Sequence, residues 1–239
     1  MKTEVPSIEV AGFLSPEIEN YRSNFRVKYA LLLADCERAS AVATTRLHAV
    51  RSVARDKATP VAIALWARCI TACQSSILLA ERGLGLEAQI LLRSALENLF
   101  LSVALVKQPD VLDKMIAKQN KEMQKQAKAI SQHKDNFDAL NPENQANVQS
   151  FIESASTIDG DISAHGAAEI ANLEFLYHAS YRTLSLIAAH PSLATAAQSF
   201  GESPFDLRFG PSDAHLDEVF KLARECLSIG DTEMAPVLG

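Results

Sequence analysis

Two charged side chains lie four residues apart inside an almost wholly apolar run. Arg93 and Glu97 belong to the segment 89–106, QILLRSALENLFLSVALV. Side chains at i and i+4 share one face of a helix, and apolar residues flank this face, so both charges are expected to point into packed surroundings. Desolvating an ion costs on the order of several kcal/mol unless it is paired and hydrogen-bonded. The pair is therefore either part of a functional site or an internal ion pair that fixes helix packing.

A second set of polar residues follows one stripe of the helix expected at about 167–189. The stripe and its neighbours comprise Glu174, His178, Tyr181, Arg182, Ser185 and His190. A solvated outer face would give the same pattern. However, Phe175 and Leu186 flank the stripe on its far side, which leaves a narrow polar strip between apolar walls. A buried polar seam, whose members must then satisfy one another by hydrogen bonds, is the alternative interpretation.

These two segments carry a family resemblance. The runs 91–97, LLRSALE, and 181–192, YRTLSLIAAHPS, resemble the LLRxxxE and YxxxSxxxxH helices of an uncharacterised bacterial all-helical family, known as a domain of unknown function. The resemblance covers roughly residues 58–192. It implies a helical bundle in which five side chains converge on one internal site. Here those side chains are Arg93, Glu97, Tyr181, Ser185 and His190. The family brings no assigned reaction with it.

The chain also resembles, more distantly, the HEPN domains, helical bundles many of which are metal-independent ribonucleases that use an Arg, a short spacer and a His. Arg182 and His190 have seven residues between them, where that motif has four to six. Arg208 and His215 have six, but their spacer contains Gly and Pro. The resemblance implies His190 as general acid or base toward a ribose 2′-hydroxyl, with Arg182 stabilising charge on the phosphate.

Five lysines follow one face of the helix expected at 111–134. They are Lys114, Lys118, Lys121, Lys125 and Lys128. This stripe is a candidate nucleic-acid-binding surface, since lysines attract a phosphate backbone. A solvated helix face is the simpler interpretation, because glutamines interleave with the lysines and no aromatic residue is present to stack on bases.

No metal or cofactor site is expected. Histidines and acidic residues occur between 159 and 190, but no HExxH or paired Glu-x-x-His motif joins them. The Gly83-Leu84-Gly85 run lacks the third glycine and the preceding strand of a phosphate-binding loop. The four cysteines, Cys36, Cys69, Cys73 and Cys226, form no CxxC pair. They are expected to be reduced core residues, because a free cysteine behaves as a small hydrophobic side chain.

Composition indicates one soluble-type domain. The chain has 239 residues, of which 48% are hydrophobic, with nine Gly and nine Pro, and no linker-like segment divides it. The expected core spans about 16–230, with peripheral tails at 1–15 and 231–239. The net charge of −6 and pI near 5.5 argue against a wholly nucleic-acid-binding surface. The amino terminus lacks the pattern of a signal peptide, and polar residues interrupt the apolar stretches, so we expect a cytoplasmic protein without a membrane span.

Hydrophobic periodicity predicts an all-α fold, a single helical bundle of six or seven helices. The expected helices are 16–53, 60–82, 89–106, 111–134, 142–155, 167–189 and 214–227, the last capped by Ser212 and closed by Gly230. Residues 200–211 are expected to form a loop or one short extended piece. The second, third and sixth helices should form the core, with the first packed along them.

Two functions follow as hypotheses. One is a HEPN-like, metal-independent ribonuclease or nucleotide-binding role in stress or phage defence. The alternative is a non-enzymatic regulatory or interaction module whose buried polar residues are structural. The expected partners are RNA or a nucleotide, or another protein, and the chain is expected to form a homo-oligomer.

Overall fold

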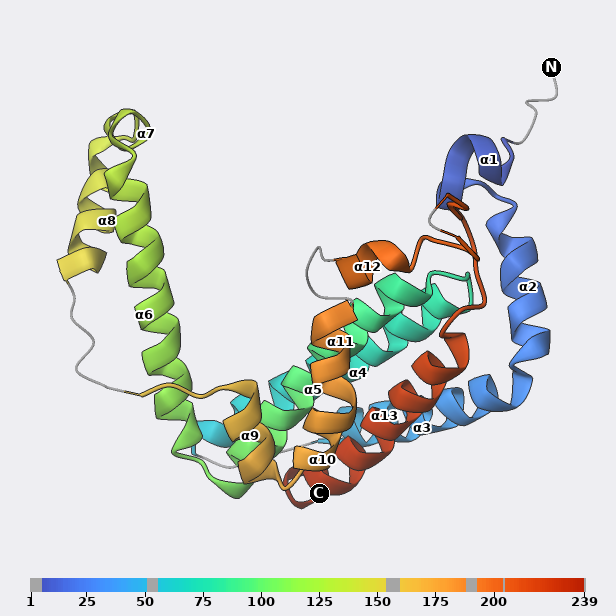
Figure 1. Cartoon of the computed structure of the whole chain (residues 1–239). Coiled ribbons are helices and arrows are strands. Elements are labelled where there is room, and N and C mark those ends of the chain that lie inside the picture. Colours follow the sequence, from blue (N-terminus) through green and yellow to red (C-terminus); the bar gives the residue numbers. More distant parts are fainter. Residues whose placement is uncertain (1–5, 51–55, 154–159, 188–192, 204, 239) are drawn as a thin grey trace.

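The computed structural model describes residues 6–50, 56–153, 160–187, 193–203 and 205–238. All regular elements in these ranges are helices, and one isolated antiparallel bridge joins Phe200 to Leu207. The prediction of an all-α fold is confirmed, and the described residues of the segment, 200–203 and 205–211, form a loop with this one bridge, as expected. Figure 1 shows a U-shaped molecule in which long packed helices form the floor and two helical arms rise from its ends.

The floor is built on α4 (Ala58–Ala80) and α5 (Gly85–Lys107), which pack against each other along their length. Asp56 caps α4, because its Oδ1 accepts hydrogen bonds from the amides of Ala58 and Thr59. The turn between the two helices contains Gly83 at φ +81°, where a Cβ would lie 2.8 Å from the Ser212 amide. A residue with a side chain would be strained there and would displace the loop that leads to the last helix.

The last helix, α13 (Leu216–Leu238), crosses α3, α4 and α5 and completes the core. Our prediction that Gly230 closes this helix is wrong, since α13 continues through it. Gly230 lies instead against the buried indole of Trp66, where a Cβ would come within 2.0 Å of Cζ3. The glycine therefore permits a close approach of two helices rather than ending one.

The first expected helix is two helices. α2 (Ile18–Lys28) and α3 (Ala30–Ala49) meet at Tyr29, whose φ of −108° and ψ of 25° lie outside the helical region. The Tyr29 ring packs against Phe220 of α13, with 5.6 Å between ring centroids. The break turns α2 away from the floor, and α2 forms one arm of the U together with the short α1 (Ile8–Ala11) and the 3-10 turn η1 (Gly12–Leu14).

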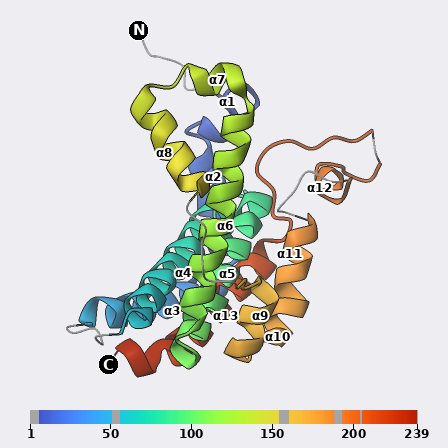
Figure 2. The same ribbon diagram turned by 90° about the vertical axis from the view of Figure 1, so that its left-hand side faces the viewer.

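The other arm consists of α6 (Val111–Gln132), α7 (Lys134–Asp138) and α8 (Pro142–Glu153), with α8 folded back on α6. Figure 2, turned by 90°, shows α6 in front of α4 and α5, with its far end rising beyond them. Both expected helices in this region are thus present at nearly the expected bounds.

The helix expected at 167–189 is divided. α9 (Ala164–Ala171) begins at Ser163, whose Oγ accepts from the Gly166 amide, and ends at Asn172 in the left-handed conformation. Asparagine tolerates this conformation better than most residues, which explains the stop. The chain then forms α10 (Glu174–Leu176), the π-helical turn η2 (Tyr177–Tyr181), α11 (Arg182–Ile187) and, after an interval, α12 (Leu193–Ala197).

The central helices differ from those expected. The second and third expected helices, α4 and α5, do form the core, but the final helix α13 joins them where we expected the sixth, and α3 packs along α13. The segment α9–α11 covers one side of α5 instead. By length and composition alone, α4 and α5 are also apolar enough to cross a membrane, a property that buried core helices share.

Candidate functional site

Arg93 and Glu97 lie on the face of α5 that α11 covers. Arg93 Nη2 is 3.1 Å from Glu97 Oε1, so the expected ion pair is present. Its expected burial is only partial, because the Arg93 side chain is 25% exposed and that of Glu97 is 36% exposed. The helices α9–α11 cover this face of α5 only in part, so part of each side chain stays accessible to solvent.

Tyr181 and Ser185 supply the other half of the site from η2 and α11. The π-helical turn widens the helix at 177–181, and π turns often occur at functional sites. Tyr181 is 8% exposed, and its ring stacks on that of Tyr177 with 5.2 Å between centroids. Phe100 of α5 packs edge-on against the Tyr181 ring at 6.1 Å. This aromatic packing holds the phenol oxygen against α5.

Four side chains form one connected network at this junction. The Tyr181 hydroxyl donates to Glu97 Oε1 at 2.6 Å, and Arg93 Nη2 donates to the Tyr181 oxygen at 2.8 Å. Arg93 Nε donates to Ser185 Oγ at 3.0 Å, and Ser185 Oγ in turn donates to the Tyr181 carbonyl at 2.8 Å. The guanidinium carbon also lies 4.9 Å from the centre of the Tyr181 ring. The structure thus brings together four of the five side chains that the family resemblance placed at one site.

Burial raises the pKa of Tyr181 to about 12, and the hydrogen bond and negative charge of Glu97 act in the same direction. The positive charge of Arg93 and the Ser185 hydroxyl oppose this rise in pKa. At neutral pH the phenol is therefore protonated and acts as a hydrogen-bond donor. A fixed guanidinium beside a neutral phenol can hold an anion, while Glu97 offers a proton acceptor.

A groove of about 390 Å³ opens beside Glu97, between α5, α6 and the start of α9. Its apolar lining includes Leu101, Met115 and Ile162, and its polar lining includes Lys118 and Ser163. The carboxylate of Glu97 is therefore reachable from the concave side of the molecule. Our expectation that Glu97 points into packed surroundings does not hold for this edge.

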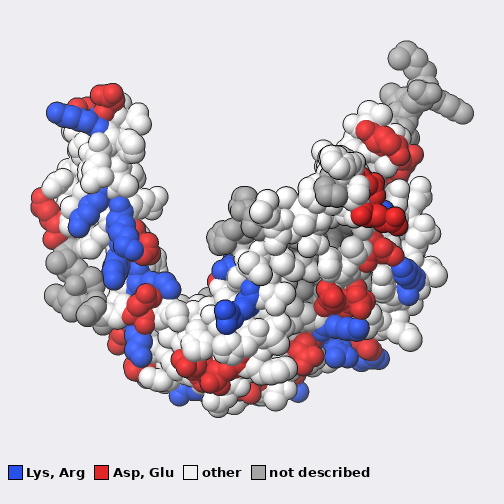
Figure 3. All heavy atoms as spheres, in the orientation of Figure 1, with Lys and Arg blue, Asp and Glu red and all other residues white. Residues whose placement is uncertain are grey.

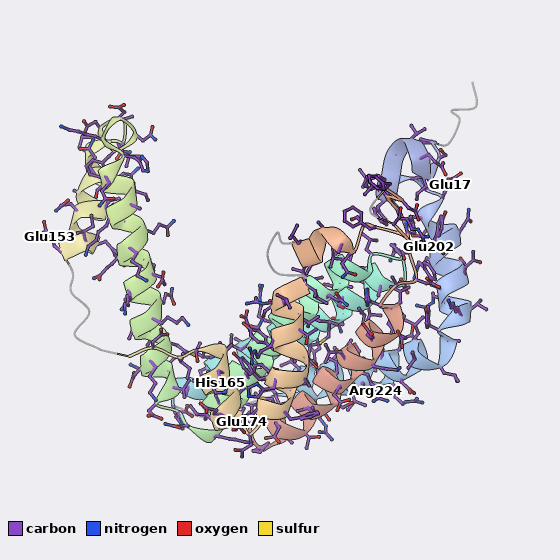
Figure 4. All side chains as sticks on the ribbon, viewed as in Figure 1. Glu17, Glu153, His165, Glu174, Glu202 and Arg224 are labelled. Atoms are coloured by element: carbon purple, nitrogen blue, oxygen red, sulfur yellow. The ribbon has the colours of Figure 1, made fainter. Side chains whose placement is uncertain are left out.

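His165 of α9 and His178 of the polar stripe lie next to the network. His165 of α9 is 4.8 Å from the Tyr177 ring and 5.5 Å from the His178 ring, measured between centroids, and its Nδ1 is 3.6 Å from Glu169. Figure 4 shows His165 on α9, near the column of helices that carries Glu174. The two histidines meet because the chain turns at Asn172 and α9 packs against η2.

The polar stripe is mostly solvated. Glu174, His178 and Arg182 are exposed, and only Tyr181 and Ser185 turn toward α5. The interpretation as a solvated face is thus correct for Glu174, His178 and Arg182. The buried polar seam consists of Tyr181 and Ser185 alone among the described residues of the stripe. Arg182 takes no part in the hydrogen bonds of the network, and His190 lies outside the described residues.

The lysine stripe lies along α6. Figure 3 shows basic side chains gathered along this arm. Lys118 donates to the Ile162 carbonyl at 2.7 Å and pairs with Asp161 at 3.2 Å, so it secures the segment before α9. Lys125 pairs with Glu122 at 2.6 Å, and Lys114 is half-buried. Lys121 and Lys128 are exposed and form no ion pair with a described residue.

The second Arg–His pair does not form a unit. Arg208 bonds to Asp206, at 3.1 Å from Nη2, whereas His215 lies between Glu218 at 3.0 Å and Gln198 at 2.9 Å. Within the described ranges, no group of three or more His, Cys, Asp or Glu side chains is placed to hold a metal ion. All four cysteines are free and buried, as expected for core residues.

Sequence reasoning missed the most buried charge. Glu81, at the end of α4, is 1% exposed and binds Arg22 and Arg26 of α2 at 2.5 Å each, as well as Arg82 at 3.1 Å. A carboxylate beside the Gly83 turn resembles an ordinary exposed helix end, and two of its partners, Arg22 and Arg26, lie more than fifty residues away. Only the path of α2 reveals the cluster, which is a structural clamp rather than a site.

Comparison with known proteins supports the family resemblance. A family model for a family of unknown function, DUF5677, matches residues 60–206. No curated protein and no solved structure matches the chain. The matched segment runs from the start of α4 to the loop before α13, and it contains Arg93, Glu97, Tyr181 and Ser185. The more distant likeness to HEPN domains stays a prediction. Because the match covers more than half of the 239 residues, the chain belongs to the DUF5677 family of unknown function.

Proposed function

We propose that this protein binds RNA on its concave side and holds a phosphate at the Arg93–Tyr181 junction. The observation that carries the proposal is the state of Arg93. Two of its nitrogens are fixed by Tyr181, Ser185 and Glu97, yet the side chain is 25% exposed. Its Nη1 forms no hydrogen bond with any residue in the described part of the chain. An oriented guanidinium with a remaining donor suits a phosphate oxygen.

The protonated phenol of Tyr181 strengthens this proposal. Its pKa of about 12 keeps the hydroxyl proton in place at neutral pH. An incoming phosphate could accept that hydrogen bond in place of Glu97. Glu97 would stay at the site and keep its ion pair with Arg93 at 3.1 Å, so its carboxylate would not be left unpaired, which is the costly alternative.

The exposed lysines of α6 support an extended ligand rather than a free phosphate. Lys121 and Lys128 stand on the same arm, where basic side chains gather (Figure 3). Each lysine that neutralises a backbone phosphate releases a counterion and adds to affinity in a salt-dependent way. Lys118 and Lys125 already pair with acidic residues, so we assign the contacts to Lys121 and Lys128 first.

The finer form of the proposal is a metal-independent ribonuclease that serves in stress or phage defence. His190 would take the proton of a ribose 2′-hydroxyl, whose oxygen attacks phosphorus. The P–O5′ bond then breaks as the 2′,3′-cyclic phosphate forms, the 5′-oxygen takes a proton from water, and His190 returns its proton to solvent. Arg93 or Arg182 would stabilise the negative charge on the phosphate in the transition state.

One observation favours a second candidate, a non-enzymatic interaction module. Arg93, Glu97, Tyr181 and Ser185 satisfy one another, so the network could serve only to hold α11 on α5. With Arg93 Nη1 hydrogen-bonded to solvent, such a network rigidifies a helix junction without any ligand. Under this reading, Arg93 has no ligand and RNA does not bind.

The test is RNA binding by fluorescence anisotropy over a series of salt concentrations, followed by cleavage in excess EDTA. Arg93→Gln and the double variant Lys121→Gln/Lys128→Gln should each weaken binding by about tenfold, and the double variant should lower the salt slope by roughly two. Arg38→Gln is the matched control, because Arg38 is 71% exposed on α3 and, among the described residues, pairs only with Asp35. It should bind as the wild type does.

Cleavage separates the enzyme from the binding protein. His190→Ala and Arg182→Ala should abolish cleavage while leaving binding and the melting temperature nearly unchanged. If wild-type protein binds RNA but cuts none, the ribonuclease step is wrong and the binding proposal stands. If the wild type binds no RNA, or all variants bind equally, the interaction module replaces the proposal.

A further inference from the structure

A row of aromatic rings continues from the Tyr181 network toward solvent. Tyr177 stacks on Tyr181, with 5.2 Å between the ring centroids and 21° between the ring planes. The His165 ring of α9 lies 4.8 Å from the Tyr177 ring, and the His178 ring lies 5.2 Å from it. At the other end of the row, the guanidinium carbon of Arg93 lies 4.9 Å from the centre of the Tyr181 ring. The row therefore connects two histidines with the guanidinium that we propose as the phosphate ligand.

The two histidines form the solvent-exposed end of this row. The His165 side chain is 41% exposed and His178 is exposed, whereas Tyr177 is half-buried and Tyr181 is buried. The two imidazole rings meet edge to face, with 5.5 Å between centroids and 66° between planes. Contact with each other and with Tyr177 already restricts both rings, so a ligand that packs on them would cost little further side-chain entropy.

The exposed histidines lie beside the groove that opens at Glu97. The lining of this groove includes Ala164, which directly precedes His165, and also Lys118 of α6. Figure 4 shows His165 on the floor of the U, on the side of the α6 arm. An RNA strand whose phosphates follow the lysines of α6 and reach Arg93 would therefore pass close to His165.

We propose that His165 and His178 form a stacking platform for the bases of single-stranded RNA, and this inference rests on the RNA binding proposed above. An unpaired base can lay its flat face on a ring, whereas a base inside a duplex has both faces covered by its neighbours. No Phe, Tyr or Trp occurs in α6, so the lysine stripe has no such ring of its own. Every base has a π face, so the platform should accept all four bases.

A neighbouring charge favours bases over phosphates at this platform. Glu169 Oε2 lies 3.6 Å from His165 Nδ1, and the Glu169 side chain is 53% exposed. A carboxylate at this position repels a phosphate but does not repel a neutral base. We therefore assign the bases to the two histidines and the phosphates to Arg93 and the exposed lysines of α6.

The experiment measures the binding of a mixed-sequence single-stranded RNA and of its duplex by fluorescence anisotropy. The double variant His165→Gln/His178→Gln removes both rings but keeps polar side chains. It should weaken binding of the single strand by about tenfold and binding of the duplex by less than about twofold. The double variant His165→Phe/His178→Phe keeps both rings, so it should bind the single strand within about twofold of the wild type.

His215→Gln is the matched control. The His215 side chain is 35% exposed, and its ring nitrogens interact with Glu218 and Gln198 at 3.0 and 2.9 Å. This variant should bind both RNAs as the wild type does. A single strand that carries the fluorescent base 2-aminopurine reports stacking directly. Its fluorescence should be quenched by the wild type and by the Phe variant, but not by the Gln variant.

The outcomes separate the platform from RNA binding itself. Three results would each overturn the platform and leave RNA binding in place: unchanged single-strand affinity of the Gln variant, equal losses for single strand and duplex, or no recovery with Phe. If the wild type binds no RNA, both proposals fail. Should the double Gln variant melt at a lower temperature, His178→Gln alone decides, since His178 is exposed. It should weaken binding of the single strand by about threefold without a change in melting temperature.

Discussion

The Tyr181 hydroxyl donates to Glu97 Oε1 across 2.6 Å, and Arg93 Nη2 lies 3.1 Å from the same oxygen. One carboxylate oxygen of Glu97 therefore contacts both Tyr181, the last residue of η2, and Arg93, one turn earlier on α5. Protonation and packing are coupled at this point, because the phenol must keep its proton to make the contact. The site should respond to alkaline pH and to the loss of Glu97 in different ways.

The first prediction concerns alkaline pH. The folded-state pKa of Tyr181 is about 12, raised by burial and by Glu97, against an ordinary value near 10. A raised pKa means that the folded state binds the proton more tightly, so this stabilisation is complete below pH 10 and is lost as the pH rises to about 12. The difference in unfolding free energy between wild type and Tyr181→Phe should fall by roughly 2 kcal/mol over this range.

Urea unfolding at a series of pH values measures this difference. In a Glu97→Ala background the fall should be smaller, since the second cause of the raised pKa has been removed. A difference that stays constant from pH 9 to pH 12 would show that Tyr181 ionises as an ordinary tyrosine does.

The second prediction concerns the loss of Glu97. A fully buried guanidinium without its partner would cost about 3 to 5 kcal/mol, but Arg93 is 25% exposed and keeps Ser185 and Tyr181 as partners. We therefore expect Glu97→Ala to lower the unfolding free energy by about 1 to 2 kcal/mol. Glu122→Ala is the control, because Glu122 is 60% exposed and its single ion pair within the described part of the chain is with Lys125; it should cost under about 0.5 kcal/mol. Equal losses for the two variants would contradict a special role for Glu97 in stability.

The third prediction concerns the clamp between α2 and α4. Glu81 is 1% exposed and receives hydrogen bonds from Arg22, Arg26 and Arg82. Glu81→Ala should cost about 3 kcal/mol, because three charge-assisted contacts are lost and α2 is released from the floor. Glu19→Ala removes a 52% exposed carboxylate that contacts Arg22 and Arg82, and it should cost under about 1 kcal/mol.

Chemical denaturation measures both losses of stability, and hydrogen exchange of α2 amides locates the effect. Glu81→Ala should speed exchange in α2 far more than in α5. Similar exchange rates in the two helices would mean that α2 is held by its apolar contacts instead.

Local pattern predicted the parts of the site that lie on one helix. Arg93 and Glu97 could be paired from their spacing alone, because i and i+4 positions adjoin on any helix. The contact of Tyr181 and Ser185 with Arg93 has no such basis. It depends on the stop at Asn172 and on the π-helical turn that follows, and simple periodicity assumes an unbroken helix over both. Family resemblance, not spacing, indicated that these residues meet.

Long-range packing explains the remaining errors in the fold. Tyr29 breaks the first helix because its ring packs against Phe220, which lies 191 residues later in the chain. Glu81 is buried because α2 folds back over the end of α4. In each case the residue looks like an ordinary helical residue in its local sequence. Its structural role comes from a contact with a residue far along the chain, which a sequence window of ten or twenty residues does not include.

The last prediction concerns Gly230, which local sequence indicated as a helix stop. Gly230 lies inside α13, and a Cβ at this position would come within 2.0 Å of Trp66 Cζ3 and 2.3 Å of Cη2. The indole is fully buried between α4 and α13 and cannot move aside without displacing its neighbours. Gly230→Ala should therefore lower the unfolding free energy by about 2 to 3 kcal/mol through overpacking.

Gly166→Ala is the matched control, with the opposite expected sign. Gly166 lies in the first turn of α9, and a Cβ there would make ordinary contacts at 3.4 Å with Ile162 and 3.5 Å with Ser163. Alanine should stabilise the protein by up to about 1 kcal/mol, because it reduces the freedom of the unfolded chain and favours the helix. If both variants are stabilised in urea unfolding, α13 does not approach Trp66 as closely as described, and Gly230 would then act as the helix stop that its type suggests.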